Sequence, residues 1–347
     1  MLQSNAKAGR RTKRTKQILR SFAAGASLFP RSLLEDLNRQ LALGKNHVYI
    51  NDFDNNPHEY SLKAPVWCRD AGAYRIRYNS LQSLTNLNPS VEEHKPNPVS
   101  ITYATYEEPR RSLASIRRSF RSYRRAWMKS ETYPWLIRQV RSMAHIAYLN
   151  KVVCFGLGTL GLMAEQSVAY SHTQHAAVET IVKTLKEQRS CDILCYAQDP
   201  AYNDADKEVL RSIGITPIND PKGFLEVDSN TLVISVNPNI PVKQIIADVQ
   251  WPGGMIWNTV EPEEQEMTTW TKIIMSNTEA WLAPFTTDPD SPRVRHMVQQ
   301  YSQETFPDVD KRFGDLTIYI RKPPEVTSPT NHNSNTNKRS CRRTYRF

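Results

Sequence analysis

Residues Lys151 to Gly161 read Lys-Val-Val-Cys-Phe-Gly-Leu-Gly-Thr-Leu-Gly, and this segment gives the strongest indication of the fold. Its first five residues are mostly β-branched or apolar, which predicts a buried strand. Three of the 12 glycines in the chain, Gly156, Gly158 and Gly161, follow at once. Glycines between a strand and a helix allow a tight turn and close approach of the backbone to a ligand. The stretch therefore predicts the first strand of a Rossmann-like domain, with these glycines as candidate ligand-binding residues.

Beyond this turn, apolar runs alternate with helical stretches, which is typical of a parallel sheet covered by helices. The predicted strands span residues 151–155, 192–196, 215–218, 231–236, 255–257 and 316–320, and the predicted helices lie near 172–188, 203–212, 241–249 and 262–270. Residues 284–314 are rich in proline and irregular. The predicted fold class is α/β, with a doubly wound, mostly parallel sheet of about six strands over residues 151–321.

Polar residues follow three of the predicted strands. Asp199 follows the second strand, where nucleotide-binding and adenosyl-binding folds grip ribose hydroxyls. It lies 43 residues beyond Gly156, against about 20 in the dinucleotide fingerprint, so a longer loop and helix intervene. Asn237 and Asn258 follow the fourth and fifth strands and would open onto the same crevice. An Asp-Pro or Asn-Pro turn that stops the strand is the alternative explanation.

The histidines and cysteines give little indication of a catalytic or metal site. His172 and His175 are three residues apart without a third ligand of matching spacing, so a surface or capping role is predicted and no metal site. Cys154 falls in a predicted buried strand, which favours a core role. The five cysteines show no metal or redox spacing, which favours a reduced, intracellular compartment.

The net charge of +10 is unevenly distributed. Residues 1–34 hold eight basic residues and no acid, and residues 109–145 hold ten against one. Residues 146–321 hold 14 basic and 23 acidic residues. A domain that binds nucleic acid should itself carry the positive face. Nucleic-acid binding is therefore not expected of the core, and only the basic arms remain candidates for it.

The amino-acid composition divides the chain into regions of different character. Residues 1–34 are predicted to be a disordered basic arm, residues 35–108 a loop-rich region, and residues 322–347 a disordered tail. The arm is typical of a nuclear-import patch, but it also fits a mitochondrial transit peptide. We expect the cytoplasm or nucleus, with the mitochondrion as the alternative. The longest uncharged apolar stretch, 152–164, is shorter than the ~18 residues of a membrane span, so no transmembrane segment is predicted.

Two basic amphipathic helices are predicted within residues 109–150. In the first, residues 113–127, apolar side chains advance by three or four positions and arginines fill the other faces. Such a helix can bind a protein partner or lie on a membrane. The alternative is a helix packed on its own domain, with a solvated arginine face.

The region around the glycine turn resembles the sensitivity-to-red-light-reduced family, whose domain opens with a strand and a Gly-x-Gly turn. Residues 153–158, Val-Cys-Phe-Gly-Leu-Gly, match that opening. The resemblance covers about residues 135–321. Further matching positions are Gln174, the strand end at 196–200, Glu208, Leu210, Gly214, Trp251 and Asn258. The sequence departs from the family where Pro-His-Cys after the fourth strand is replaced by residues 236–238, Val-Asn-Pro, and where Trp257 stands in place of a glycine.

The resemblance implies an SRR-like regulatory domain, since relatives act in light and clock signalling, haem-synthesis control and cytoskeletal stability. The leading hypothesis is a non-catalytic regulator whose Rossmann-like crevice binds an adenosyl compound, a dinucleotide or a protein partner. The ligand-binding candidates are Gly156, Gly158, Gly161, Asp199, Asn237 and Asn258. The rival hypothesis is an adenosylmethionine-dependent methyltransferase in which Asp199 holds the ribose and the loop at Asn237 faces the substrate. A third hypothesis is an interaction protein that uses helix 113–127.

Overall fold

The computed structural model describes residues 2–65, 68, 74–90, 97–103, 109–189, 191–275 and 278–323, with side chains from residue 13 onward. The helices are α1 (Leu2–Ala23), α2 (Arg31–Ala42), α3 (Leu81–Thr85), α4 (Leu113–Trp127), α5 (Thr132–Ile146), α6 (Glu165–Arg189), α7 (Asp204–Ser212), α8 (Lys222–Glu226), α9 (Val242–Val249) and α10 (Pro292–Val298). The strands are β1 (His47–Asn51), β2 (Pro57–Ser61), β3 (Tyr74–Tyr78), β4 (Val99–Tyr103), β5 (Lys151–Phe155), β6 (Leu194–Gln198), β7 (Thr216–Pro217), β8 (Thr231–Ser235), β9 (Gly254–Asn258), β10 (Thr271–Met275), β11 (Thr278–Leu282), β12 (Tyr301–Thr305) and β13 (Leu316–Arg321).

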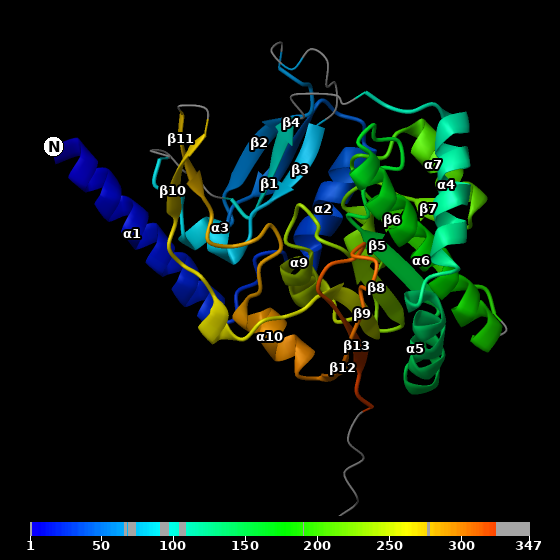
Figure 1. Cartoon of the computed structure of the whole chain (residues 1–347). Helices are drawn as coiled ribbons and strands as arrows, with labels where there is room; N and C mark the ends of the chain where they lie inside the picture. Colours follow the sequence, from blue (N-terminus) through cyan, green and yellow to red (C-terminus); the bar gives the residue numbers. More distant parts are fainter. Residues whose placement is uncertain are drawn as a thin grey trace, which may run out of the picture.

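Seven of the described strands form the central sheet, in the order β12-β13-β9-β8-β5-β6-β7 (Figure 1). Strands β7, β6, β5, β8 and β9 are parallel, whereas β13 runs antiparallel between β9 and β12. From β5 the chain moves outward to β6 and β7 and then returns to β8 on the other side. This reversal is a topological switch point, where open α/β sheets bind ligands. The predicted doubly wound, mostly parallel α/β sheet is confirmed, and β12 adds a seventh strand to the six expected from the sequence.

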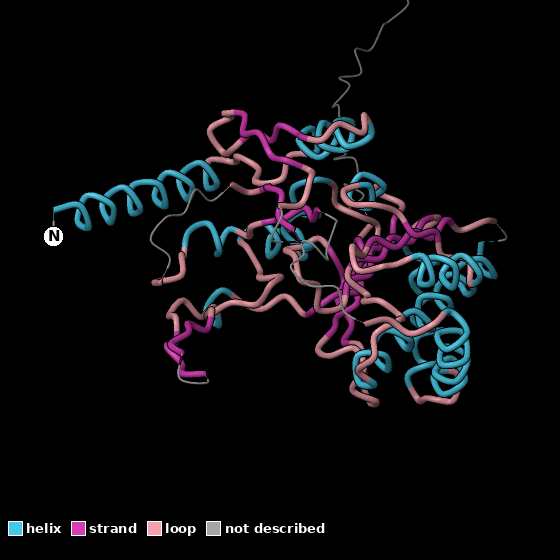
Figure 2. Tube along the Cα trace, turned by 90° about the horizontal axis from the view of Figure 1, so that it is seen from above, coloured by secondary structure: helices cyan, strands magenta, loops and turns pink. Residues whose placement is uncertain are grey.

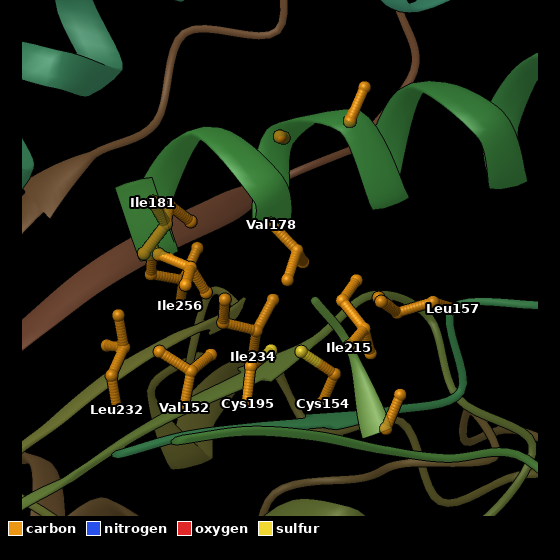
Figure 3. Packing of buried hydrophobic residues seen from close by; sticks show 14 of the residues in the cluster. Val152, Cys154, Leu157, Val178, Ile181, Cys195, Ile215, Leu232, Ile234 and Ile256 are labelled. Carbon is orange, nitrogen blue, oxygen red and sulfur yellow. The ribbon is translucent and has the colours of Figure 1, made fainter. Parts of the chain in front are cut away.

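Helices α4 to α7 cover one face of the sheet. The side chains of Val152 and Cys154 on β5, Cys195 on β6 and Ile234 on β8 point toward Val178 on α6 (Figure 3). All of them are less than 5% exposed. The core role predicted for Cys154 is thereby confirmed, and burial raises the pKa of its thiol. An apolar layer of this kind is the main stabilising contribution to such a fold.

Helix α4 packs on α6 and α7 through its apolar face. Ile116, Phe120 and Trp127 are at most 4% exposed, and the Trp127 indole N–H donates to the Thr180 hydroxyl over 3.0 Å. The predicted amphipathic helix is therefore present, and its apolar stripe is covered by its own domain.

The other face of the sheet is covered by α8, α9 and α10, and over these lies an N-terminal layer built from α2, α3 and the two-stranded sheets β1-β2 and β3-β4. The structure here corrects the disordered arm expected over residues 1–34. In its place, α1 and α2 form, and Ile18, Phe22 and Phe29 are at most 8% exposed. The reason is that apolar residues spaced along a basic segment can be buried once a distant surface is supplied by the fold. The N-terminal part of α1 projects away from the rest of the chain (Figures 1 and 2).

Two further expectations need correction. A helix was expected near residues 262–270, but the chain forms only a 3₁₀ turn, Glu263–Gln265, before the β10-β11 hairpin. Residues 284–314, expected to be irregular, contain α10 and β12. Of the predicted tail, residues 324–347 lie outside the described part of the chain. No helix in the described part is both long and apolar enough to cross a bilayer.

Candidate functional site

The glycine turn leaves the carboxyl end of β5 and immediately meets the loop that follows β8. Gly156 has a φ of +65°, and a Cβ placed on it would lie 2.9 Å from Cβ of Pro238. Glycine is required at this position for two reasons, because φ is left-handed and because the neighbouring loop occupies the space. At Gly156 the crevice is therefore occupied by Pro238.

Gly158 is the more open part of the turn. Its φ is +76°, and a Cβ there would make only an ordinary contact, 3.7 Å from Cβ of Ser171. The Gly158 N–H donates to Oδ2 of Asp199 over 2.9 Å, and the Ser171 hydroxyl donates to the Gly158 carbonyl over 2.8 Å. The ends of β5 and β6 are thus joined by a hydrogen bond between the two residues predicted to face a ligand.

Gly161 turns away from the other two glycines. A Cβ on it would lie 3.3 Å from Cδ1 of Ile116 and 3.5 Å from Oδ1 of Asp206. Asp206 is fully buried, and its carboxylate accepts hydrogen bonds from the Thr159 hydroxyl (2.6 Å) and the Leu160 N–H (3.0 Å). This end of the turn is packed against α4 and α7, so the glycine here serves close packing.

Asp199 lies just after β6, as the sequence places it. Its Oδ1 accepts from the Ala201 N–H over 2.9 Å while Oδ2 accepts from Gly158. Burial raises the pKa of Asp199, and the two backbone N–H groups oppose that rise. The charge of Arg75 on β3, in the N-terminal layer, also lowers the pKa. A carboxyl group held in this way can still accept a hydrogen bond from a hydroxyl group, because each oxygen carries two lone pairs.

Asn237 and Asn258 meet at the other side of the switch point. The Asn237 N–H donates to Oδ1 of Asn258 (2.9 Å), and Nδ2 of Asn258 donates to Oδ1 of Asn237 (2.7 Å). Asn237 has a φ of +45°, a left-handed conformation that asparagine tolerates better than most residues. The structure therefore brings these two residues together as a pair that closes the ends of β8 and β9.

The two histidines of α6 lie in the interior, which corrects the predicted surface or capping role. His172 and His175 are both 0% exposed, and burial lowers the pKa of each to about 4. Nδ1 of His175 lies 2.7 Å from the Ser171 carbonyl oxygen, and its Nε2 lies 2.8 Å from the Tyr202 hydroxyl. A neutral ring that donates from Nδ1 and accepts at Nε2 satisfies both contacts. His172 lies beside the rings of Phe120 and Tyr123 on α4, and His175 lies beside the ring of Tyr202.

Sequence reasoning missed a second carboxyl group at this edge, Asp220, which follows β7. Its Oδ1 accepts from the Tyr78 hydroxyl (2.6 Å) and from Nε2 of Gln198 (3.0 Å). Burial raises the pKa of Asp220 to about 7. Tyr78 is 142 residues away in sequence, so no local pattern announces the contact. Asp206, by contrast, could have been found from the sequence, because Asn203 and Asp206 have the spacing of a capping box, which they form at the start of α7.

Two cavities lie away from the glycine turn. One, with about 10 Å³ of room, is apolar and lies between α6 and the sheet, beside Val178 and Ile234. The other, of about 300 Å³, lies in the N-terminal layer between α2 and β1, lined by Leu37, Tyr49 and Phe53 among others. Across the described residues, no three His, Cys, Asp or Glu side chains gather in a group that could hold a metal ion.

Comparisons with known proteins address the family. No curated protein matches the chain. Among solved structures, a 1,6-didemethyltoxoflavin-N1-methyltransferase from Burkholderia thailandensis, with bound 1,6-didemethyltoxoflavin and S-adenosylhomocysteine, is similar over 62% of this chain and 93% of its own, at 9% identity and a TM-score of 0.29. The family model described as the SRR1 domain matches residues 136–320, which is more than half of the chain. That match confirms the resemblance drawn from the glycine turn and the strand ends. The chain belongs to the SRR1 domain family.

Proposed function

We propose that this SRR1 domain protein is a non-catalytic regulator that binds an adenine-containing small molecule at the carboxyl edge of β5 and β6. The observation that carries the proposal is the hydrogen bond from the Gly158 N–H to Asp199 (2.9 Å). It brings an open, left-handed glycine and a carboxylate together beside the switch point. Folds of this topology bind the ribose of an adenine compound with an acidic residue at this position.

The contacts divide the six candidate residues into two sets. Gly156 lies against Pro238, Gly161 lies against Ile116, and Asn237 is paired with Asn258. Gly158 is the one glycine of the three at which an added Cβ would make only ordinary contacts, and Asp199 is hydrogen-bonded to it. We therefore assign the ribose to Asp199, with the Gly158 backbone beside it, and we assign the other four residues to the support of the edge.

The rival function, methyl transfer from adenosylmethionine, uses the same edge but needs an acceptor at the loop after β8. In that loop the Oδ1 of Asn237 already accepts from Asn258, and Pro238 contacts Gly156. These contacts favour a binding protein over an enzyme. Transfer of a labelled methyl group to any product would reverse that preference.

The proposal is tested by thermal shift and calorimetry on the full chain with S-adenosylhomocysteine, S-adenosylmethionine, NAD⁺ and ATP. We expect one of these compounds to stabilise the protein, and Gly158→Val to remove that stabilisation. Gly214→Val is the matched control, because Gly214 also has a positive φ (+81°), and a Cβ there meets nothing within 4 Å. Both variants should lose stability from backbone strain, but only Gly158→Val should lose the ligand response.

Two results would overturn the proposal. One is a ligand response that survives in Gly158→Val, and the other is the lack of a response to all four compounds at millimolar concentration. If Gly158→Val does not fold, Asp199→Asn provides the second variant, since it removes the charge while keeping an oxygen that accepts a hydrogen bond.

A further inference from the structure

The arginines of α4 fall into two sets. Arg117 pairs with Glu208 on α7 (2.6 Å), and Arg124 pairs with Glu179 on α6 (2.7 Å). Arg118, Arg121 and Arg125 are exposed and form no ion pair with the described residues. Arg121 donates only to the carbonyl oxygen of Arg117, in its own helix (3.3 Å). The second set is therefore not used to hold α4 on its domain.

The unpaired cations form a row along the helix. Positions 118, 121 and 125 advance by three and four, so Arg118, Arg121 and Arg125 face the same side of α4, and the exposed Lys129 lies in the turn just beyond its end. Successive members are about one helical turn, roughly 5.4 Å, apart. We call this set the basic row. In Figure 1, α4 stands at the outer edge of the molecule, beyond α6 and α7.

Neighbouring charges restrict what can bind. Within residues 109–145 the only acid is Glu131, whereas the domain that follows holds 23 acidic residues against 14 basic ones. Glu208 and Glu179 each pair with an arginine of α4 outside the row, Arg117 and Arg124. Duplex DNA contacts a wide surface, and the domain that follows α4 carries more acidic than basic residues, so its binding is disfavoured. A narrow ligand that contacts only the row avoids that repulsion.

Two other classes of partner fit poorly. Insertion into a membrane needs an exposed apolar face, but Ile116, Phe120 and Trp127 are buried against α6 and its neighbours. Single-stranded nucleic acid is usually held by aromatic side chains on which its bases stack. The row contains none.

We propose that the basic row docks an acidic helix of another protein, one that carries carboxylates at one-turn spacing along one face. Such a helix repeats its side chains at the interval of the row, and each arginine can bind a carboxylate through two parallel hydrogen bonds. The proposal does not depend on the adenine site, because α4 and the Gly158–Asp199 edge use different residues.

The test uses the full chain and two synthetic helical peptides of identical composition. In one peptide the glutamates lie at positions i, i+4, i+7 and i+11, and in the other they are spread around the helix. Binding is measured by fluorescence anisotropy at about 0.15 M salt, where surface attraction is screened beyond about 8 Å. We expect the aligned peptide to bind about tenfold more tightly, the factor expected of a few additional surface ion pairs.

The variant Arg118→Glu/Arg121→Glu/Arg125→Glu should lose binding of the aligned peptide by more than about tenfold. The matched control is Lys45→Glu/Lys63→Glu/Lys222→Glu, which makes the same charge change at exposed residues of the N-terminal layer and α8. Its affinity should stay within about twofold. Equal losses in the two variants, or equal binding of the two peptides, would overturn the proposal. A duplex DNA that binds more tightly than the aligned peptide, and loses that binding only in the row variant, would assign the row to nucleic acid instead.

Discussion

Oδ1 of Asp248 lies 2.6 Å from Nη1 of Arg293, and this pair fastens the N-terminal layer to the SRR1 domain. Oδ2 of Asp248 accepts the N–H groups of Leu28 (2.7 Å) and Phe29 (3.0 Å). Arg293 donates in turn to the carbonyl oxygens of Phe22 and Ala26, and its guanidinium lies 4.2 Å from the centroid of the Phe22 ring. One carboxylate on α9 and one arginine on α10 thus bind the end of α1 and the segment that follows it.

We predict that Asp248→Ala lowers the free energy of unfolding by about 3 kcal/mol, because it leaves Arg293 and two backbone N–H groups without their carboxylate. Asp192→Ala is the control, since Asp192 is 95% exposed and pairs with Lys186 at the surface (3.2 Å). Its cost should stay below about 1 kcal/mol. Urea denaturation measures both, and limited proteolysis should release the α1 segment first in Asp248→Ala. Equal costs in the two variants would contradict the role given to Asp248.

The contact between Gly156 and Pro238 gives a second prediction. Gly156→Ala and Gly44→Ala both place a Cβ at nearly the same positive φ, +65° and +64°, which costs about 1–2 kcal/mol. Only at Gly156 does the new Cβ meet another atom, Pro238 Cβ at 2.9 Å, whereas Gly44 has nothing within 4 Å. We expect Gly156→Ala to lose about 1–3 kcal/mol more in chemical denaturation. Pro238→Gly, which removes the Cβ of residue 238, should recover part of that loss when combined with Gly156→Ala, and no recovery would show that the clash lies elsewhere.

A third prediction concerns pH. The folded protein raises the pKa of Asp220 from 3.8 to about 7 by burial. Between these values the folded chain binds a proton that the unfolded chain has released, so this contribution to stability falls as pH rises from about 4 to 7. Asp220→Asn cannot titrate, yet it keeps an oxygen for the Tyr78 hydroxyl. As pH rises, the free energy of unfolding of the variant should therefore increase relative to that of the wild type, by up to about 1.4 kcal/mol for each unit by which the pKa is raised.

The measurement for Asp220→Asn is urea denaturation at intervals between pH 4 and 8. Asp288 behaves in the same direction, because burial also raises its pKa to about 7, so the variant should remove only part of the decline. Asp192→Asn provides the control for loss of a surface charge. A difference between Asp220→Asn and wild type that stays constant over this range would contradict the prediction.

The buried histidine contact gives a fourth prediction. Tyr202→Phe removes the hydroxyl that lies 2.8 Å from Nε2 of His175 and leaves that nitrogen buried without a partner. We expect a loss of about 1–3 kcal/mol in thermal or chemical unfolding. Tyr49→Phe, at a tyrosine that is 47% exposed, should change stability by less than about 0.5 kcal/mol. A Tyr202→Phe cost as small as that of Tyr49→Phe would mean that the ring nitrogen finds another partner.

The sequence predicted the parts of the fold that have a local pattern. β5 matches the predicted range 151–155, and β8, β9 and β13 differ from theirs by only one or two residues, because their central residues are buried and apolar. β12 escaped notice because its residues, Tyr-Ser-Gln-Glu-Thr, are polar and mostly exposed at the edge of the sheet. The expected helix at 262–270 failed because Pro262 followed by glutamates resembles a helix start but leads into the β10-β11 hairpin.

The features that the sequence did not predict depend on contacts between residues far apart in the chain. The basic segment before residue 34 looked unable to pack, yet Ile18 and Phe22 are buried by surfaces formed much later in the sequence. In the candidate site, Gly158, Asp199, Asn237 and Asn258 all follow the ends of parallel strands, and the sequence therefore predicted that they lie at one edge of the sheet. In the structure Gly158 contacts Asp199, and Asn237 contacts Asn258. The sequence did not reveal that Pro238 would occupy the space at Gly156, because that depends on how two loops meet across the sheet.

The dependence of the N-terminal layer on α9 has a consequence for how the chain is made. Leu28, just after α1, and Asp248 are 220 residues apart in sequence, so on the ribosome α9 emerges long after the segment that it binds. At about 5–20 residues per second, the nascent chain carries uncovered apolar side chains of α1 and α2 for roughly 10–40 s. The rate of translation therefore sets how long these apolar side chains stay uncovered.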